Sequence, residues 1–443
     1  MSKPTDIERV SQNRVVKLFK EELNYTYLGD WEEREGNSNI EEEYLTKYLK
    51  RKAYSDRHIS KAIFELQQVA TNFSDSLYTT NKNVYSKLRN GIKVKVSAGE
   101  NYDTVKLINW QNPKDNDFYI AEEVTYKGNK TKRPDIVLYI NGIAIGVLEL
   151  KRGIVDIGEG IRQNITNMQD RFIKPFFTTN QILFAGNDSE GLRYGTISSP
   201  EKFYLSWKED VEDNSRLLLD KYILKMCSKE RIIELLYDFI VFDAGIKKLP
   251  RAHQYFGVKE SQKYVNRSEG GIIWHTQGSG KSISMVYLAK WILENNPKAR
   301  VAIVTDRDEL DKQIEDVFTD SDEIIFRTKS GKDLMDKLGQ PSPRLLCSLV
   351  HKFGKKDVVN FEKYLKELSE NPVQVSGELF VFVDECHRTQ SGKLHDAMKM
   401  ILPDALFIGY TGTPLLKKDK QKSIEIFGPY IGNPSTFDEA VAD

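Results

Sequence analysis

Residues 275–282 read His-Thr-Gln-Gly-Ser-Gly-Lys-Ser and directly follow the apolar run 271–274. A strand that enters a glycine-rich turn, with lysine and serine opening a helix, is the pattern that holds the phosphates of ATP. The turn must expose backbone N–H groups, which glycine permits because it has no Cβ. The sequence therefore predicts a nucleotide site formed by Thr276, Gly278, Ser279, Gly280, Lys281 and Ser282.

The residues of this loop have distinct expected roles. Lys281 would reach the β- and γ-phosphates, and Ser282 would ligate Mg²⁺. The helix that we expect over 283–293 would point its positive N-terminus at the anion. His275 stands where this pattern usually has a small residue, and a chance match in a polar loop is the alternative interpretation.

A second segment supports the nucleotide site. Residues 379–383, Leu-Phe-Val-Phe-Val, predict a buried parallel strand, and Asp384, Glu385, Cys386 and His387 follow it. The C-terminal end of such a strand is where an open α/β sheet places its ligand. Asp384 would hold Mg²⁺ there, directly or through water, and Glu385 would orient or deprotonate the attacking water. The two segments together predict an ATPase core.

Carboxylates and a lysine also gather in the first half of the chain. Asp135 follows Arg-Pro at the start of one predicted strand, and Glu149-Leu-Lys151 closes the next. A turn at Asn141-Gly142 would make the two strands adjacent, and side-chain alternation places Glu149 and Lys151 on one face. Asp135 and Glu149 could hold Mg²⁺ beside a scissile phosphate, while Lys151 positions or activates the attacking water.

The surroundings of this cluster leave two interpretations open. A strand that ends in Glu-x-Lys is often only a solvated edge, but the run 143–148 is almost wholly apolar, which indicates a buried strand. Gln163, on the helix expected next, could turn towards the cluster. Glu122 and Glu123, on the preceding strand, are either further metal ligands or part of a solvated face.

The bulk composition excludes several classes of protein. The 443 residues contain 65 Lys+Arg and 65 Asp+Glu, so a surface for nucleic acid has to be a local patch. Three scattered cysteines without Cys-x-x-Cys spacing argue against a disulfide framework and structural zinc. No uninterrupted apolar run approaches the ~18 residues of a membrane span, and the polar N-terminus lacks the apolar stretch of a signal peptide. We therefore expect a cytoplasmic protein with no membrane partner.

The pattern of elements predicts more than one α/β domain. A helix over 6–23 precedes a polar loop at 27–39 and amphipathic helices up to residue 89. A first α/β unit follows, with a helix over 158–172 and strands at 92–96, 119–126, 136–140, 144–150 and 181–185. Helical segments then lead into Lys247-Lys-Leu-Pro250, which we interpret as the end of a linker. Beyond it strand and helix alternate, as in a doubly wound domain.

The Asp…Glu-x-Lys segment resembles the nuclease core shared by restriction enzymes and many repair nucleases. In RecB-type members the next helix carries Gln-x-x-x-Tyr, whereas here Gln163 is followed by Asn167 at the tyrosine position. With the ATPase core downstream, the whole order resembles the motor and endonuclease (R) subunit of type I restriction-modification enzymes. The resemblance implies an α/β protein, with a restriction-endonuclease-like nuclease domain followed by a RecA-like P-loop NTPase domain.

The ATPase half resembles superfamily 2 DNA translocases in further motifs. Gln254, in Arg-Ala-His-Gln-Tyr-Phe, would hydrogen-bond the adenine, and residues 305–313 would touch the DNA backbone. Residues 409–414, Gly-Tyr-Thr-Gly-Thr-Pro, would couple the ATP state to DNA grip, with His387 as the bridge. The family implies double-stranded DNA as substrate, Mg²⁺ and ATP as cofactors, and separate methyltransferase and specificity subunits as partners.

The resemblance also sets expected boundaries. A helical region and nuclease domain would span 1–230 with its core at about 92–200, a linker 231–250, and a first RecA-like motor domain 251–443. The second RecA-like domain, which supplies arginine fingers in such motors, is not expected here, so we expect the chain by itself to lack competent ATPase activity. Two other functions stay open: a helicase–nuclease of DNA repair or phage defence without a methyltransferase, and an ATP-gated DNA-binding scaffold whose nuclease site is inert.

Overall fold

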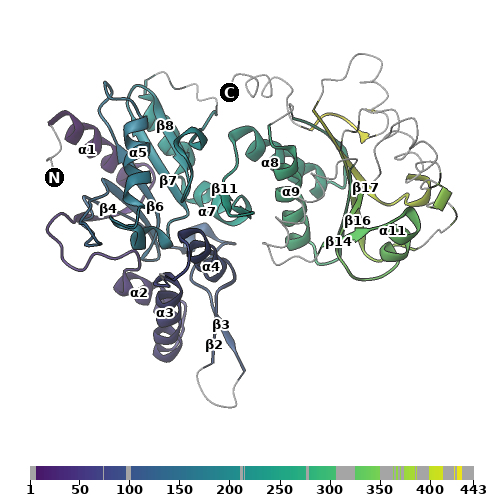
Figure 1. Ribbon diagram of the computed structural model, residues 1–443, viewed down its shortest axis with the longest axis horizontal. Helices are drawn as coiled ribbons and strands as arrows, with labels where there is room; N and C mark the ends of the chain where they lie inside the picture. Colours follow the sequence, from purple (N-terminus) through teal and green to yellow (C-terminus); the bar gives the residue numbers. More distant parts are fainter. Residues whose placement is uncertain are drawn as a thin grey trace. The chain divides into compact units, whose positions relative to one another are not determined.

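The structure is a computed structural model. It describes the chain from residue 6 to residue 431, apart from residues 73, 96–100, 210–212, 214, 276–278, 306–324, 350–362, 364–365, 368–369, 371–373, 385, 387–398, 413–423 and 425–426. The chain divides into two compact units, Met1–Arg251 and Ala252–Asp443, and each unit is built around its own sheet (Figure 1).

The first unit contains a mixed sheet with the strand order β1-β4-β5-β6-β7-β8-β9. The pairs β1–β4 and β6–β7 are parallel, and the other neighbours are antiparallel. The strands are β1 Thr26–Asp30, β4 Phe118–Glu122, β5 Ile136–Ile140, β6 Ile143–Leu150, β7 Ile182–Asn187, β8 Gly191–Gly195 and β9 Leu205–Ser206. Strands β5 and β6 are buried along their whole length because nearly all their side chains are apolar, so they form the centre of the sheet.

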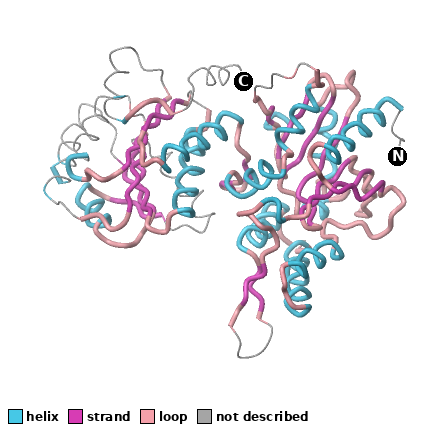
Figure 2. Tube along the Cα trace, turned by 180° about the vertical axis from the view of Figure 1, so that it is seen from behind, coloured by secondary structure: helices cyan, strands magenta, loops and turns pink. Residues whose placement is uncertain are grey.

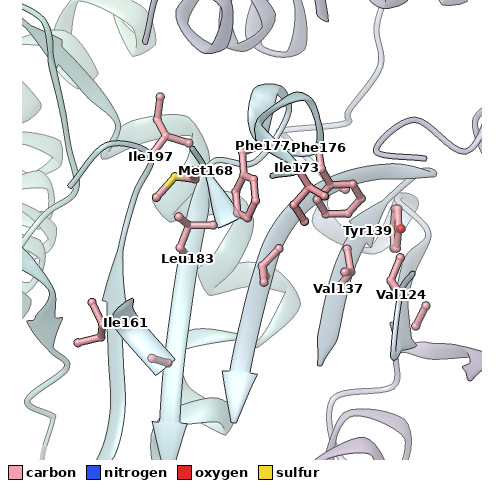
Figure 3. Close-up of a cluster of buried hydrophobic side chains, with 14 of the residues drawn as sticks. Val124, Val137, Tyr139, Ile161, Met168, Ile173, Phe176, Phe177, Leu183 and Ile197 are labelled. Atoms are coloured by element: carbon pink, nitrogen blue, oxygen red, sulfur yellow. The ribbon is translucent and has the colours of Figure 1, made fainter. Parts of the chain in front are cut away.

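The helices of the first unit are α1 Asp6–Glu21, α2 Glu42–Arg51, α3 Asp56–Ala70, α4 Leu77–Asn90, α5 Gly158–Asn167, α6 Leu218–Met226 and α7 Lys229–Asp238. Helix α5 connects the parallel strands β6 and β7 and contacts both. Next to it, Met168, Phe176 and Phe177 are buried in one apolar cluster with Leu183 of β7 (Figure 3). This cluster fixes how closely α5 approaches β6.

Two segments of the first unit differ from the sequence-based expectation. Residues 27–39, expected as a polar loop, contain most of β1, an edge strand whose side chains are half-buried or exposed. Residues 231–250, expected as a linker, form most of α7 and an antiparallel hairpin of β10 Val241–Asp243 and β11 Ile246–Lys248. Ile232 and Leu236 of α7 are buried, so the segment belongs to the first unit. A second hairpin, of β2 Ile92–Val94 and β3 Asp103–Val105, contacts α3.

The second unit contains a parallel sheet with the order β12-β17-β16-β13-β15-β14. Its strands are β12 Gly271–Trp274, β13 Ala299–Thr305, β14 Ile325–Thr328, β15 Leu345–Leu349, β16 Glu378–Val383 and β17 Leu406–Thr411. Helices α8 Ala252–Asn266 and α9 Lys281–Asn295 lie on one face and α11 Gly331–Leu338 on the other (Figures 1 and 2). Cover on both faces explains the continuous apolar runs in β13 and β16.

Within the described ranges, no helix is both long and apolar enough to cross a bilayer. The three cysteine side chains, Cys227, Cys347 and Cys386, are buried in the two units. Burial raises the pKa of the Cys227 thiol above its usual range, which makes this thiol unreactive.

Candidate active sites

The first candidate site lies where β5 begins and β6 ends. The two strands are antiparallel and pair Ile136 with Leu148, so Asp135 and Glu149 come next to each other at the same sheet end. The turn between the strands is formed by Asn141 and Gly142, with φ of 54° and 89°. These left-handed residues suit a tight hairpin, and the strand pairing expected from the sequence is the one that the structure has.

Backbone and side-chain contacts hold Asp135 and Lys151 at this end. The Leu150 N–H donates to Asp135 Oδ2 at 2.7 Å, and Lys151 Nζ lies 3.9 Å from the same oxygen. Lys151 Nζ also donates to the Leu150 carbonyl oxygen at 2.9 Å. The side chains of Lys151 and Asp135 keep 15% and 18% of their surface exposed, so both stay accessible to a substrate.

Glu149 is fully buried and is held by helix α5. Gln163 Nε2 donates to Glu149 Oε2 at 2.6 Å, and Asn167 Nδ2 donates to Oε1 at 3.3 Å. Gln163 therefore lies where the sequence suggested. The contact of Asn167 was not predicted, although its position four residues after Gln163 puts both amides on one helix face.

The electrostatics of this cluster favour a cation. Burial, and then the neighbouring Asp135, raise the pKa of Glu149 well above its usual range, while Lys151 acts in the opposite direction. A divalent cation between the two carboxylates would favour their ionised forms. Two carboxylates with the Leu150 carbonyl are hard oxygen donors, and Mg²⁺ is commonly held by one or two carboxylates plus substrate phosphate. The residues present therefore fit Mg²⁺.

Glu122 and Glu123, suggested as further metal ligands, are engaged by cationic and amide groups instead. Gln12 Nε2 of α1 donates to both carboxylates at 2.9 Å. Arg133 Nε lies 2.6 Å from Glu123 Oε2, and Arg9 lies 3.5 Å from each carboxylate. Within the described part of the chain, no group of three or more His, Cys, Asp or Glu side chains is arranged to hold a metal ion. Arg9 and Arg133 therefore pair with these carboxylates, while burial and the neighbouring Asp135 still raise the pKa of Glu123.

The second candidate site lies at the C-terminal ends of β12 and β16. Gly280, with φ of 85°, leads into α9, and a Cβ on it would come within 2.2 Å of Gln254 Nε2. Lys281 Nζ lies 3.7 Å from Asp384 Oδ1, and their side chains are only 11% and 2% exposed. Ser282 follows at the start of α9 and is half-buried. The structure thus brings Lys281, Ser282 and Asp384 to one edge of the parallel sheet.

Gln254 lies on α8 and contacts the loop itself. Its Nε2 donates to the carbonyl oxygens of Ser279 at 2.9 Å and Gly280 at 3.2 Å. The neighbouring His253 Nε2 lies 3.1 Å from the Ser279 oxygen. The expected contact of Gln254 with adenine stays a prediction, and in this structure the side chain connects α8 to the loop.

His275 is unusual at the start of such a loop, and its side chain is buried. Its ring meets that of His253 edge-on at 5.3 Å, and Ser284 Oγ lies 3.4 Å from Nδ1. Gly257 makes room, since a Cβ there would lie 3.1 Å from His275 Nε2. Burial, with His253 and Lys281, lowers the pKa of His275 to about 3, so the ring is neutral at physiological pH.

Several predicted residues lie outside the described part of the chain. These are Thr276, Gly278, Glu385 and His387, together with residues 306–313 and 413–414 of the translocase motifs. The residues next to them are described: Thr305 ends β13, and Thr411 ends β17. The His275 N–H donates to the Thr411 carbonyl at 2.9 Å, so the start of the loop and the 409–414 segment are adjacent.

Comparison with known proteins identifies both halves of the chain. Residues 7–202 match the family described as type I restriction enzyme R protein N terminus, and residues 253–443 match the SWI2/SNF2 ATPase family. Among solved structures, the chain is similar to the SWI2/SNF2 ATPase core of Sulfolobus solfataricus in complex with double-stranded DNA. The similarity covers 46% of this chain and 40% of that chain, with 15% sequence identity and a TM-score of 0.33.

Two curated relatives match across both halves. One is a putative type I restriction enzyme endonuclease subunit, MjaIXP, of Methanocaldococcus jannaschii, 29% identical over 78% of this chain and 36% of its own length. The other is the type I restriction enzyme HindI endonuclease subunit of Haemophilus influenzae, 29% identical over 80% of this chain and 37% of its own. The matched part is thus somewhat more than a third of each relative. The two halves of the chain are thus similar to the N-terminal domain of type I restriction enzyme R proteins and to SWI2/SNF2 ATPases, in the order in which the two curated endonuclease subunits match it.

Proposed function

We propose that this chain carries the DNA-cleaving site and the first half of the ATP-driven motor of a type I restriction R subunit. The observation that carries the proposal is the cluster of Asp135, Glu149 and Lys151 at one sheet end, with Glu149 completely buried. A solvated edge would leave such a carboxylate in water. A buried carboxylate beside a second one is costly without a cation, which disfavours an inert site.

Each residue of the cluster has a role that follows from its position. Asp135 and Glu149 would hold Mg²⁺ together with the Leu150 carbonyl; when bound, the ion polarises the scissile phosphate and makes water a better nucleophile. Lys151, beside Asp135, would orient the attacking water and offset charge on the phosphate. Gln163 would keep the Glu149 carboxylate in place.

The second unit would drive movement along double-stranded DNA by ATP hydrolysis. Lys281 would bind the phosphates, Ser282 and Asp384 would hold the nucleotide's Mg²⁺, and Glu385 would activate water. In the cytoplasm the whole R subunit would act in a complex with methyltransferase and specificity subunits, and would cut unmodified DNA after translocation.

The nuclease assignment is tested with the full-length protein in its assembled complex. Asp135→Asn, Glu149→Gln and Lys151→Ala each remove a ligand or charge used at the scissile phosphate, so we expect DNA cleavage to fall by at least ~100-fold. ATP hydrolysis should stay near the wild-type rate. Glu201→Gln is the control, because Glu201 is an exposed carboxylate paired with Arg162. Cleavage at the wild-type rate by the Glu149→Gln enzyme would show that the site is misassigned.

A pull-down separates the restriction assignment from a repair or defence helicase–nuclease. We expect the tagged full-length protein to recover methyltransferase and specificity chains from its own host. Recovery of neither chain, with cleavage still dependent on Glu149, would favour the helicase–nuclease that works without a methyltransferase.

A further inference from the structure

The two carboxylate pairs of the first unit differ in whether arginines contact them. Glu123 lies against the guanidinium groups of Arg133 and Arg9 and also accepts a hydrogen bond from the Gln12 amide. Helix α5 holds Glu149 through the neutral amides of Gln163 and Asn167, which donate one hydrogen bond to each carboxylate oxygen. A neutral donor fixes the direction of a carboxylate and leaves its charge available to a cation.

We propose that Asn167 is a positioning residue for the nuclease metal: with Gln163 it forms an amide clamp that holds Glu149 in the orientation that binds the cation. The inference rests on the proposed nuclease function. Each amide occupies one lone pair of one carboxylate oxygen, so the plane of the carboxylate cannot rotate freely. The remaining lone pairs are left for a divalent ion.

The local structure explains why a short side chain serves at position 167. Asn167 is 1% exposed and is the last residue of α5. Helix α5 approaches β6 closely at Gly160, where a Cβ would come within 3.4 Å of the Glu149 carbonyl oxygen. At this spacing the Asn167 amide already reaches Glu149 Oε1 at 3.3 Å.

The same helix offers a matched control. Asn164 is as buried as Asn167, but its Nδ2 donates to the Phe184 backbone carbonyl at 2.9 Å rather than to Glu149. Replacing Asn164 therefore removes an equally buried amide and its hydrogen bond without touching the clamp. A purely structural role of the buried amides would make the two positions behave alike.

The test is Mn²⁺ binding by the 443-residue chain, with free Mn²⁺ measured by electron paramagnetic resonance. We expect Asn167→Ala to weaken Mn²⁺ binding about 10–100-fold, as loss of a partner that orients a metal ligand typically does. Asn164→Ala should bind Mn²⁺ like the wild type while it melts at a lower temperature. Asn167→Leu removes the amide and roughly keeps the side-chain volume. If Asn167→Ala does not fold, we expect Asn167→Leu to show the same weakening of Mn²⁺ binding.

The outcome also separates the clamp from the function on which it rests. If Glu149→Gln loses Mn²⁺ binding and Asn167→Leu retains it in full, the clamp is wrong and the nuclease site stands. If Glu149→Gln binds Mn²⁺ as the wild type does, the metal site itself is misassigned and both proposals fall. Equal weakening by Asn164→Ala and Asn167→Ala would reduce Asn167 to a structural residue.

Discussion

Lys281 and Asp384 come from distant parts of the sequence and lie 3.7 Å apart in a nearly closed environment. A buried ammonium and carboxylate compensate each other's loss of hydration. With the proposed roles, the phosphates of a bound nucleotide would become the partner of Lys281, and Mg²⁺ that of Asp384. The pair therefore keeps both charges ready at the edge of the sheet before the ligand arrives.

Lys281→Ala removes the ammonium and leaves the Asp384 carboxylate facing the phosphates. We expect the affinity of the full-length protein for a fluorescent ATP analogue to fall at least ~10-fold, since a hydrogen bond to a charged group is worth about 1.5–3 kcal/mol. Lys298→Ala, at an exposed position, should bind like the wild type. Unchanged binding by Lys281→Ala would mean that the phosphates lie elsewhere.

At the residue scale, the sequence predicted the cluster of Asp135, Glu149 and Lys151 because strand alternation and a two-residue turn determine the distances between them. It did not predict what holds Glu123. Gln12 is 111 residues away from Glu123 in the chain. No local sequence pattern predicts a contact between residues so far apart. From the sequence alone, the polar face of α1 is expected to face solvent, whereas in the structure α1 contacts β4.

The β5–β6 hairpin is the element that brings Asp135 next to Glu149. Its register depends on the turn at Asn141 and Gly142, because a slip by one residue would turn Glu149 to the other face of the sheet. A residue outside the hairpin also stabilises the turn, because the Glu41 N–H donates to the Gly142 carbonyl at 2.8 Å.

Gly142→Ala should therefore destabilise the first unit strongly. Its φ is +89°, and a Cβ would come within 2.7 Å of the Glu41 carbonyl and 2.8 Å of the Leu45 nitrogen. We expect a loss beyond the about 1–3 kcal/mol of backbone strain alone, measured by urea denaturation. Gly36→Ala is the control, because its φ is +75° with no atom within 4 Å of the added Cβ. Equal losses for the two variants would contradict the packing argument.

Most central elements could be predicted from the sequence, and the peripheral ones could not. Strand β5 was predicted with its observed bounds because five apolar residues lie between turn signals. Strand β1 was missed since its edge position imposes no apolar alternation. The supposed linker at 231–250 was misjudged because Lys247, Lys248 and Pro250 resemble a solvated connection, while α7 packs into the unit.

The whole molecule divides between Arg251 and Ala252, and Lys247 lies just before this division in the interior of the first unit. It is 3% exposed, and its Nζ donates to Asn81 Oδ1 at 2.9 Å and Gln181 Oε1 at 2.5 Å. Both acceptors are neutral amide oxygens, which explains why burial lowers the pKa of Lys247 well below its usual range. The β10–β11 hairpin is thus tied to α4 and to Gln181, the residue before β7, by a side chain whose charge is costly to bury.

Lys247 should make stability depend on pH. The unfolded chain keeps this proton up to about pH 10.4, whereas the folded protein releases it at lower pH. Unfolding therefore takes up a proton between the two pKa values, and the free energy of unfolding rises with pH there by up to about 1.4 kcal/mol per pH unit. Lys247→Met should remove this slope in urea denaturation, whereas Lys248→Met, at a half-buried position paired with Asp243, should keep it. Parallel pH profiles for the wild type and Lys247→Met would refute the assignment.

The strand order of the second unit has a consequence for how the protein is made. Strand β12 leads into the loop that we propose to bind phosphate. It pairs with β17, with Trp274 opposite Thr411, and on its other side with residues 429–431. A ribosome that adds ~5–20 residues per second needs roughly 7–30 s to reach β17 after β12 has been synthesised. Throughout that interval an apolar strand has no partner for its backbone groups. The nascent chain is then open to chaperone capture, and nucleotide can assist folding only once almost the whole unit has emerged.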